Sequence, residues 1–286
     1  MATSTASFGA GKRESHDASA YYSREMSGAR PVLQPTGLVQ DPPKRIIDKI
    51  FWQSSEVMNQ IPDSTVALMV TSPPYNVGKD YDDDLSLDAY LDLLHRVFSE
   101  TYRVLEAGGR IAVNVANLGR KPYLALNHHV AQILDDIGFL LRGEIIWQKA
   151  KGAGGSCAWG SWQSAKTPTL RDLHEYILVA SKESFARQCS GDDTISKEDF
   201  MDATLSVWNL APASAKRVGH PAPFPIDLPK RLIELYTFEN DLVLDPFMGA
   251  GTTGIAAKQT NRHYVGYEIN ADYRKLAISR IEEATA

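Results

Sequence analysis

Apolar runs of strand length alternate with longer amphipathic segments along most of this chain, and this alternation restricts its fold more than any other feature. The runs at 65–70, 110–115, 241–245 and 263–267 are rich in apolar residues, as expected for strands that are buried on both faces. Such strands, when separated by helices, are typical of proteins with a mostly parallel sheet. We therefore predict an α/β fold.

The intervening segments carry the period and the stop signals of helices. The segment that begins at Leu87, for example, repeats apolar residues at helical spacing until Gly108 and Gly109 end it. Two further apolar runs predict additional strands. The prediction has helices at 54–60, 87–105, 122–137, 229–236, 252–259 and 271–283, and additional strands at 143–147 and 174–179.

The composition changes along the chain. Residues 1–44 are rich in small polar residues and proline and show no period, which predicts a disordered N-terminal arm. Residues 45–286 form one predicted domain, whose alternation is interrupted at about 149–210 by glycines, tryptophans and an acidic run. With 43% hydrophobic residues, the chain can bury a sizeable core.

Cysteine content and charge exclude several classes of protein. Cys157 and Cys189 form no CxxC pair and no His/Cys cluster, so we predict neither a disulfide framework nor a metal site. The first twenty residues carry charges and no apolar run, and no later segment reaches the roughly 18 apolar residues of a membrane span. We therefore expect a cytoplasmic protein that does not enter a membrane. The net charge of −5 excludes a uniformly basic surface.

The first turn with chemical content joins a predicted strand to a predicted helix and reads Asp-Pro-Phe-Met-Gly-Ala-Gly-Thr-Thr-Gly at 245–254. Its glycines match GxGxxG, so an NAD-dependent oxidoreductase is one interpretation, and an ordinary tight turn is another. The carboxylate of Asp245 opposes a pyrophosphate at this helix N-terminus. A nucleoside with cationic groups, such as S-adenosylmethionine, suits Asp245 better, and Glu268 at the end of the next strand could accept both ribose hydroxyls.

The second turn follows a predicted buried strand and reads Ser72-Pro73-Pro74-Tyr75. Consecutive prolines fix φ and remove two donors, so carbonyl groups stay free at the strand end, where open α/β sheets bind ligands. The exocyclic amine of a nucleobase is a poor nucleophile because its lone pair is delocalised. Acceptors such as Ser72 Oγ and the Pro73 carbonyl could orient that amine toward a methyl donor, and Tyr75 could stack on a flipped base. The plainer interpretation is an unstructured loop.

These two turns together resemble the amino-group DNA methyltransferases of bacteria and archaea. The similarity rests on Thr-Ser-Pro-Pro-Tyr-Asn at 71–76 and Asp-Pro-Phe-Met-Gly-Ala-Gly-Thr-Thr at 245–253, in the order of the subgroup that places the catalytic motif first. His-Pro-Ala-Pro-Phe-Pro at 220–225 resembles the family segment that packs on the methionine end of the cofactor. Val-Gly-Tyr-Glu at 265–268 resembles the family's ribose-binding element, and the resemblance spans about residues 46–281.

The resemblance implies a Rossmann-like methyltransferase fold that depends on S-adenosyl-L-methionine. Its sheet is expected to have seven strands, mostly parallel with one antiparallel strand, with helices on both faces. It further implies base flipping, no metal, and a target-recognition insert at about 149–210 of the catalytic domain. The expected catalytic residues are Ser72, Pro73, Pro74 and Tyr75, and the expected cofactor-binding residues are His220, Pro221, Asp245, Phe247, Gly249, Gly251, Thr252 and Glu268.

Within the family, serine at the first catalytic position resembles the enzymes that methylate cytosine at N4, whereas aspartate is typical of enzymes that methylate adenine at N6. We therefore expect N4 methylation, with adenine N6 as the alternative. The expected partner is double-stranded DNA, and a cognate restriction endonuclease and a second copy of the chain are further candidates. The alternative that is not an enzyme is a DNA-binding module that kept the fold but has no catalytic activity. The intact turn at Ser72 argues against this alternative.

The interrupted segment also has features expected of a DNA-facing surface. Trp159 and Trp162 could stack on nucleobases or anchor a loop, and we keep both interpretations. Basic residues outnumber acidic ones between 142 and 171, where Glu144 is the one acidic residue, and phosphate contacts supply most non-specific affinity for DNA. The basic residues of this stretch are Arg142, Lys149, Lys151, Lys166 and Arg171.

Overall fold

The computed structural model describes residues 39–74, 85–119, 122–149, 160–214, 218 and 224–285. All but the last few residues of the arm predicted at 1–44 lie outside these ranges. The strands are β1 (Lys49–Phe51), β2 (Val66–Thr71), β3 (Leu105–Val115), β4 (Leu140–Gln148), β5 (His174–Ser181), β6 (Val207–Asn209), β7 (Leu242–Asp245) and β8 (His263–Tyr267). The helices are α2 (Leu87–Val104), α3 (Leu126–Ile137), α4 (Lys197–Ala203), α6 (Asp227–Tyr236), α7 (Thr252–Gln259) and α8 (Ala271–Thr285).

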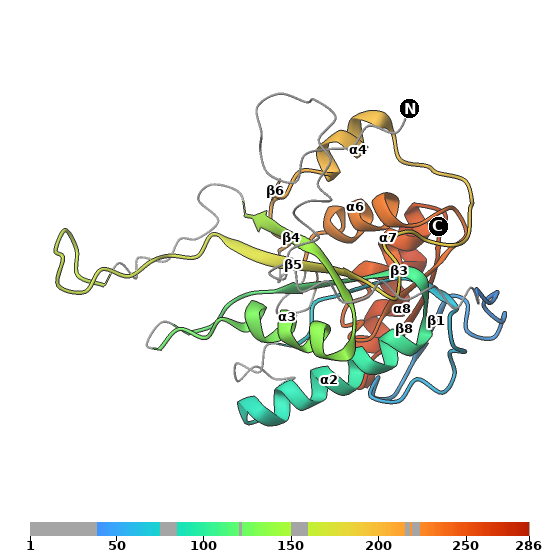
Figure 1. Cartoon of the computed structure of the whole chain (residues 1–286), viewed down its shortest axis with the longest axis horizontal. Coiled ribbons are helices and arrows are strands. Elements are labelled where there is room, and N and C mark those ends of the chain that lie inside the picture. The colour runs from blue at the N-terminus through green and yellow to red at the C-terminus, as the bar shows by residue number, and fades with distance from the viewer. Residues whose placement is uncertain are drawn as a thin grey trace, which may run out of the picture. The chain divides into compact units, whose positions relative to one another are not determined.

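The described strands form one eight-stranded sheet in the order β1-β8-β7-β2-β3-β5-β4-β6 (Figure 1). Strand β5 runs antiparallel to both of its neighbours, β3 and β4, and the other pairings are parallel. The predicted α/β fold and its single antiparallel strand are confirmed. The described sheet has eight strands where seven were expected. Six of them match predicted strands, and the other two, β1 and β6, are three-residue segments at its edges that are too short to carry a readable period.

Helices cover both faces of the sheet, as expected (Figure 1). Residues of α2 and α3 pack on one face, and residues of α4, α6, α7 and α8 pack on the other. Along β7, Leu242 and Leu244 face the first layer while Val243 faces the second. Each strand residue thus reaches an apolar layer, which explains the continuous apolar runs in the sequence.

The position of the site follows from the strand order. Helix α2 leads the chain from β2 to β3 on one side of the sheet, and α7 leads it from β7 to β8 on the other side. Strands β2 and β7 are parallel neighbours, and the order in which the chain adds strands reverses between them. Ligands of open α/β sheets bind in the crevice outside the carboxyl ends of strands at such a point. The turns that follow Thr71 and Asp245 both begin there.

The prediction of a helix at 54–60 is wrong, because this segment forms turns. Side chains of α2 bind its backbone instead. The Met58 N–H donates to Glu100 Oε2 at 2.7 Å, and Arg103 Nη2 donates to the Met58 carbonyl at 3.1 Å. These long-range bonds replace the local bonds of a helix.

The segment at 149–210 is divided between the sheet and its surroundings. Strand β5 lies inside the sheet between β3 and β4, and β6 pairs with the outer edge of β4. The described part outside the sheet consists of the β4–β5 connection, seen from residue 160, and the β5–β6 connection that contains α4. Within the described ranges, no helix combines the length and the apolar character needed to cross a bilayer.

Candidate active site

Asp245 is the last residue of β7 and lies beside the end of β2, and it is almost completely buried, with 2% exposed. Thr71 Oγ1 donates to Oδ1 at 2.7 Å, Thr253 Oγ1 donates to Oδ2 at 2.6 Å, and the Phe247 N–H donates to Oδ1 at 3.1 Å. Burial raises the pKa of Asp245 to about 6, and the three hydrogen bonds oppose this rise only partly. This carboxylate therefore fixes the two turns to each other and places a titratable charge between the ends of β2 and β7.

Glu268 follows β8 and reaches back to the glycine turn. Its Oε2 accepts from the Gly249 N–H at 2.8 Å, and its Oε1 accepts from the Asn270 N–H at 2.8 Å. Partial burial raises the pKa of Glu268 despite these backbone donors. Glu268 is half-buried, and both of its carboxylate oxygens accept hydrogen bonds from the backbone.

The spacing of glycines in this turn has a packing explanation. Gly251 adopts φ +78°, and a Cβ there would lie 2.9 Å from Ala277 Cβ on α8. A Cβ at Gly254 would lie 2.5 Å from Ile281 Cδ1 on the same helix. Gly251 therefore needs glycine for its positive φ and its close approach to α8, and a side chain at Gly254 would displace the Ile281 terminal methyl, whatever ligand the turn binds.

The remaining predicted residues of this turn lie at the start of α7 and before it. Thr252 is the first residue of α7 and is buried, with 6% exposed. Phe247 is half-buried and packs against the apolar layer that contains α2 and α3. Gly249, at φ +51°, exposes its N–H to Glu268. The structure thus gathers Asp245, Phe247, Gly249, Gly251, Thr252 and Glu268 at one end of the sheet.

The Ser72 turn begins directly after β2, next to Asp245. Ser72 and Pro74 are half-buried, and Pro73 is buried. Asn114 Nδ2 on β3 lies 3.4 Å from Ser72 Oγ, at the long end of hydrogen-bond distances. Tyr75, His220 and Pro221 lie outside the described residues, and their expected roles stay predictions.

An exposed apolar pair that no sequence motif predicted lies beside Glu268. Trp52 follows β1 and is 66% exposed, and Ile269 follows Glu268 and is 61% exposed. The Trp52 indole N–H donates to the Ile269 carbonyl at 2.8 Å. The parallel pairing of β1 with β8 brings them together, and no sequence pattern announces that pairing. Two exposed apolar side chains next to a carboxylate are suited to hold the flat ring of a nucleoside.

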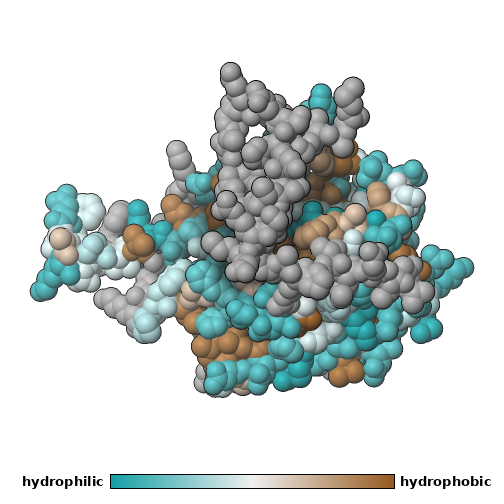
Figure 2. Space-filling view, viewed as in Figure 1, coloured by the Kyte–Doolittle hydropathy of each residue, from teal (hydrophilic) through white to brown (hydrophobic). Residues whose placement is uncertain are grey.

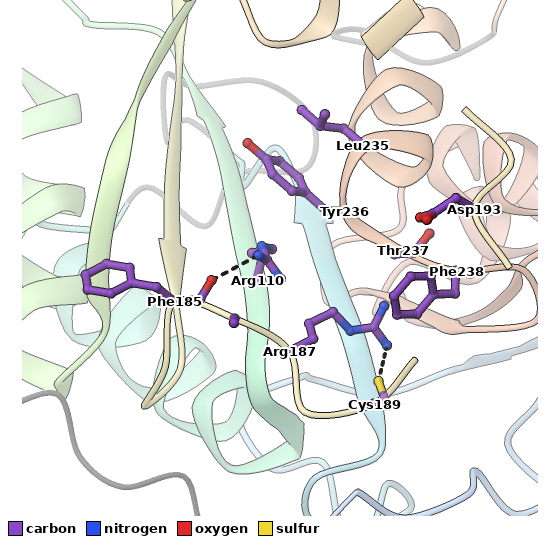
Figure 3. Close-up of a pocket in the computed structure, with 10 residues that line it drawn as sticks. Arg110, Phe185, Arg187, Cys189, Asp193, Leu235, Tyr236, Thr237 and Phe238 are labelled. Atoms are coloured by element: carbon purple, nitrogen blue, oxygen red, sulfur yellow. Dashed lines mark hydrogen bonds between the residues drawn. The ribbon is translucent and has the colours of Figure 1, made fainter. Parts of the chain in front are cut away.

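A pocket of about 340 Å³ lies at the other end of the central strands, where β7 begins, near Arg110, Arg187 and Tyr236 (Figure 3). The Arg187 guanidinium is buried and donates to Glu106 at 2.5 Å and to Asp241 at 2.5 Å. The Arg110 guanidinium donates to the Gly108 carbonyl at 2.7 Å and lies over the Tyr236 ring. These groups connect the segment after β5 to the sheet, so we assign this region to stability.

The described residues contain no group of three or more His, Cys, Asp and Glu side chains arranged to hold a metal ion. Cys189 is a free thiol beside Arg187, and burial raises its pKa. Cys157 lies outside the described ranges.

Comparison with known proteins identifies the family. Residues 66–279 match the N6_N4_Mtase family, whose description is DNA methylase. The chain belongs to this DNA methylase family. Among the relatives, the type II methyltransferase M.BglII of Bacillus subtilis is 30% identical over 250 residues, covering 82% of this chain and 69% of that protein. M.MthZI of Methanothermobacter thermautotrophicus is 29% identical over 273 residues, covering 82% of this chain and 76% of that protein.

Solved structures have the same fold as this DNA methylase. A Thermus thermophilus protein described as a DNA modification methylase superimposes with a TM-score of 0.67 and 30% identity, covering 81% of this chain and 93% of that one. Its complex with S-adenosyl-L-methionine superimposes with a TM-score of 0.65 and 29% identity, covering 81% of this chain and 92% of that one. The PvuII cytosine-N4-specific methyltransferase gives 0.65 and 18% identity, covering 83% and 90%. At 18% identity this likeness shows the fold alone.

The match confirms the predicted resemblance at the level of the family. It also favours the methyltransferase interpretation of the glycine turn over the NAD-dependent oxidoreductase.

Proposed function

We propose that this DNA methylase transfers a methyl group from S-adenosylmethionine to the exocyclic N4 amine of cytosine in double-stranded DNA after the base is flipped out. One observation supports this proposal most. The hydrogen bond between Thr71 and Asp245 joins the turn that begins at Ser72 to the glycine turn. An amine held at the first turn therefore lies beside a methyl donor held at the second.

The residues at the glycine turn fit S-adenosylmethionine. When bound, this cofactor supplies an electrophilic methyl group. The buried Asp245 charge favours a ligand with an ammonium and a sulfonium, and we expect the half-buried Glu268 carboxylate to accept ribose hydroxyls. Trp52 and Ile269 provide apolar surface for the adenine ring. Glu268 is anchored by the Gly249 and Asn270 N–H groups, so its orientation is set before a ligand binds.

The Ser72 turn orients the amine in this proposal. Ser72 Oγ and the Pro73 carbonyl accept the two N–H groups of the exocyclic amine and direct its lone pair toward the methyl donor. Tyr75 stacks on the base outside the duplex. The other acceptor of this chemistry, adenine N6, is the alternative substrate. Serine at position 72 favours cytosine through the family correlation alone.

The described hairpin at 160–173 is the element that we propose contacts DNA. It leads into the start of β5 and extends away from the sheet (Figure 1), and its surface is mostly hydrophilic (Figure 2). Trp162 is 64% exposed, and Lys166 and Arg171 are exposed as well. The Ser161 N–H donates to the Thr167 carbonyl at 3.0 Å, and the Thr167 N–H donates to Ser161 Oγ at 2.9 Å. A turn fixed in this way presents its tip to DNA at little entropic cost.

The named relatives are type II methyltransferases, so we further propose that this enzyme marks DNA in the cytoplasm as part of restriction and modification. A partner endonuclease and a homodimer belong to the same proposal.

Glu268→Ala and Ser72→Ala test the function by separating binding from chemistry. We expect Glu268→Ala to weaken S-adenosylmethionine binding by roughly 1.5–3 kcal/mol through lost charge-assisted hydrogen bonds. Ser72→Ala should retain that affinity and DNA affinity but lose most of the methylation rate. A purified chain that binds DNA but never methylates it, under conditions that saturate the cofactor, would support the rival of a non-catalytic module.

A further inference from the structure

Asn114 connects Ser72 to Glu175 on the antiparallel strand β5, and Lys149 pairs with that carboxylate. Asn114 on β3 is 2% exposed, and its Nδ2 lies 3.4 Å from Ser72 Oγ and 2.7 Å from Glu175 Oε2. Glu175 on β5 is 8% exposed, and its Oε1 lies 2.5 Å from Lys149 Nζ. The three residues lie at or next to the ends of the neighbouring strands β3, β5 and β4. They are on the side of the sheet where the parallel strands end and where Ser72 lies.

The strand register explains this arrangement. Thr71 pairs with Val113, so Ser72 and Asn114 each lie one residue beyond that pair. Strand β5 runs antiparallel to β3, so it begins where β3 ends, and Glu175 is its second residue. A strand parallel to β3 would begin at the far end of β3, away from Ser72. Its first residues could not place an acidic side chain next to Asn114.

The carboxylate determines which way the Asn114 amide faces. An amide has a donor end and an acceptor end of nearly equal shape, and a carboxylate accepts hydrogen bonds only. Glu175 therefore holds Nδ2 on its own side and on that of Ser72. Lys149 in turn offsets the free-energy cost of burying the Glu175 charge. An N–H directed at Ser72 Oγ restricts the rotation of the hydroxyl and so sets the direction from which Oγ can accept a substrate N–H.

We propose that Glu175 and Asn114 are positioning residues that orient the Ser72 hydroxyl toward the exocyclic amine of the target base. Glu175 acts through Asn114 and does not touch the substrate. The inference rests on the proposed function of Ser72, and it assigns a role in chemistry to the central antiparallel strand. A purely structural role would link β3 to β5 and would affect folding without regard to Ser72.

The first test is Glu175→Gln, with Glu144→Gln as the matched control. Glutamine can present its NH₂ group to Asn114 and allow the amide to turn, so the donor to Ser72 is lost with little change in volume. Glu144 accepts from Asn127 Nδ2 at 3.3 Å and is exposed. Under single-turnover conditions that saturate DNA and S-adenosylmethionine, we expect Glu175→Gln to slow methyl transfer by about 10- to 100-fold. The dissociation constants for DNA and for S-adenosylmethionine should stay within about twofold of wild type. The same should hold for Glu144→Gln.

A double-mutant cycle with Ser72→Ala separates positioning from folding. If Glu175 acts through Ser72, Glu175→Gln should slow methyl transfer in the wild-type background and cause no further loss in Ser72→Ala. Equal losses in the two backgrounds would overturn the proposal, as would a Glu175→Gln rate within about twofold of wild type. If Glu175→Gln fails to fold, Asn114→Ala replaces it in the same cycle with the same two outcomes. A wild-type chain that transfers no methyl group would overturn the proposed function itself, which is a different result.

Discussion

The Thr71 hydroxyl donates a 2.7 Å hydrogen bond to Oδ1 of Asp245, a residue 174 positions further along the chain. Thr71 is the last residue of β2 and Asp245 is the last residue of β7. Both side chains are buried, with 0% and 2% exposed. This bond joins the ends of β2 and β7 and sets the relative position of the Ser72 turn and the glycine turn.

Thr71→Val tests the contribution of this bond. Valine keeps the shape of threonine and removes the donor, so a buried carboxylate loses one of its three partners. We expect the free energy of unfolding to fall by about 1–3 kcal/mol in urea denaturation at neutral pH. Thr71→Ser keeps the hydroxyl and should lose clearly less. Equal stability of Thr71→Val and wild type would show that the bond contributes nothing to the fold.

The raised pKa of Asp245 predicts a pH dependence near pH 6. Burial raises this pKa to about 6, so the native chain binds a proton here more tightly than the unfolded chain. The contribution of this group to stability is therefore present below about pH 4 and is lost as the pH rises through about 6. A cationic ligand favours the ionised carboxylate, so S-adenosylmethionine affinity should rise over the same window.

Calorimetric titrations from about pH 5 to about pH 7.5 on wild type and Asp245→Asn can measure this effect. The variant cannot ionise at this position and should show a flatter profile. Parallel profiles for the two proteins would show that Asp245 is not the titrating group.

Trp52 and Trp162 are exposed to similar extents, 66% and 64%, but lie in different parts of the proposed machinery. Trp52→Ala should weaken S-adenosylmethionine binding by roughly 1–3 kcal/mol, the usual contribution of base stacking on an aromatic ring. Trp162→Ala should leave cofactor binding intact and weaken DNA binding. Calorimetry for the cofactor and anisotropy for DNA measure the two affinities. The reverse pattern would mean that the two surfaces have been assigned incorrectly.

Arg187 predicts a large effect on stability without an effect on the site. Arg187→Met leaves the Glu106 and Asp241 carboxylates without their shared partner, and Glu106 is almost completely buried, with 3% exposed. We expect a loss of about 3–5 kcal/mol in the free energy of unfolding. Arg142→Met is the control, because Arg142 is exposed and donates to the Phe185 carbonyl. Cofactor affinity, measured at a temperature where both variants are folded, should be unchanged. A loss of cofactor affinity would show that the Arg187 region affects the proposed site at the other end of β7.

Much of this architecture is readable from the sequence because the strands are buried on both faces and because the functional turns are local motifs. Strands β7 and β8 and helix α7 match the prediction closely, since their apolar runs end at Asp245 and Tyr267. Contacts between distant strands were not readable. Trp52 meets Ile269 through the pairing of β1 with β8, and Asn114 meets Glu175 because an antiparallel strand is inserted inside the sheet. Long-range bonds from α2 likewise overrode the helical period at 54–60.

Analysis of the modified base tests the central claim most directly. DNA methylated by the wild-type enzyme should be digested to nucleosides and separated by chromatography with mass detection. We predict N4-methylcytosine, which this method distinguishes from its isomer 5-methylcytosine and from N6-methyladenine. N6-methyladenine would preserve the amine chemistry at Ser72 and overturn the choice of base. 5-Methylcytosine would contradict the account, because attack through a ring carbon requires a cysteine nucleophile, and the Ser-Pro-Pro turn after β2 provides none.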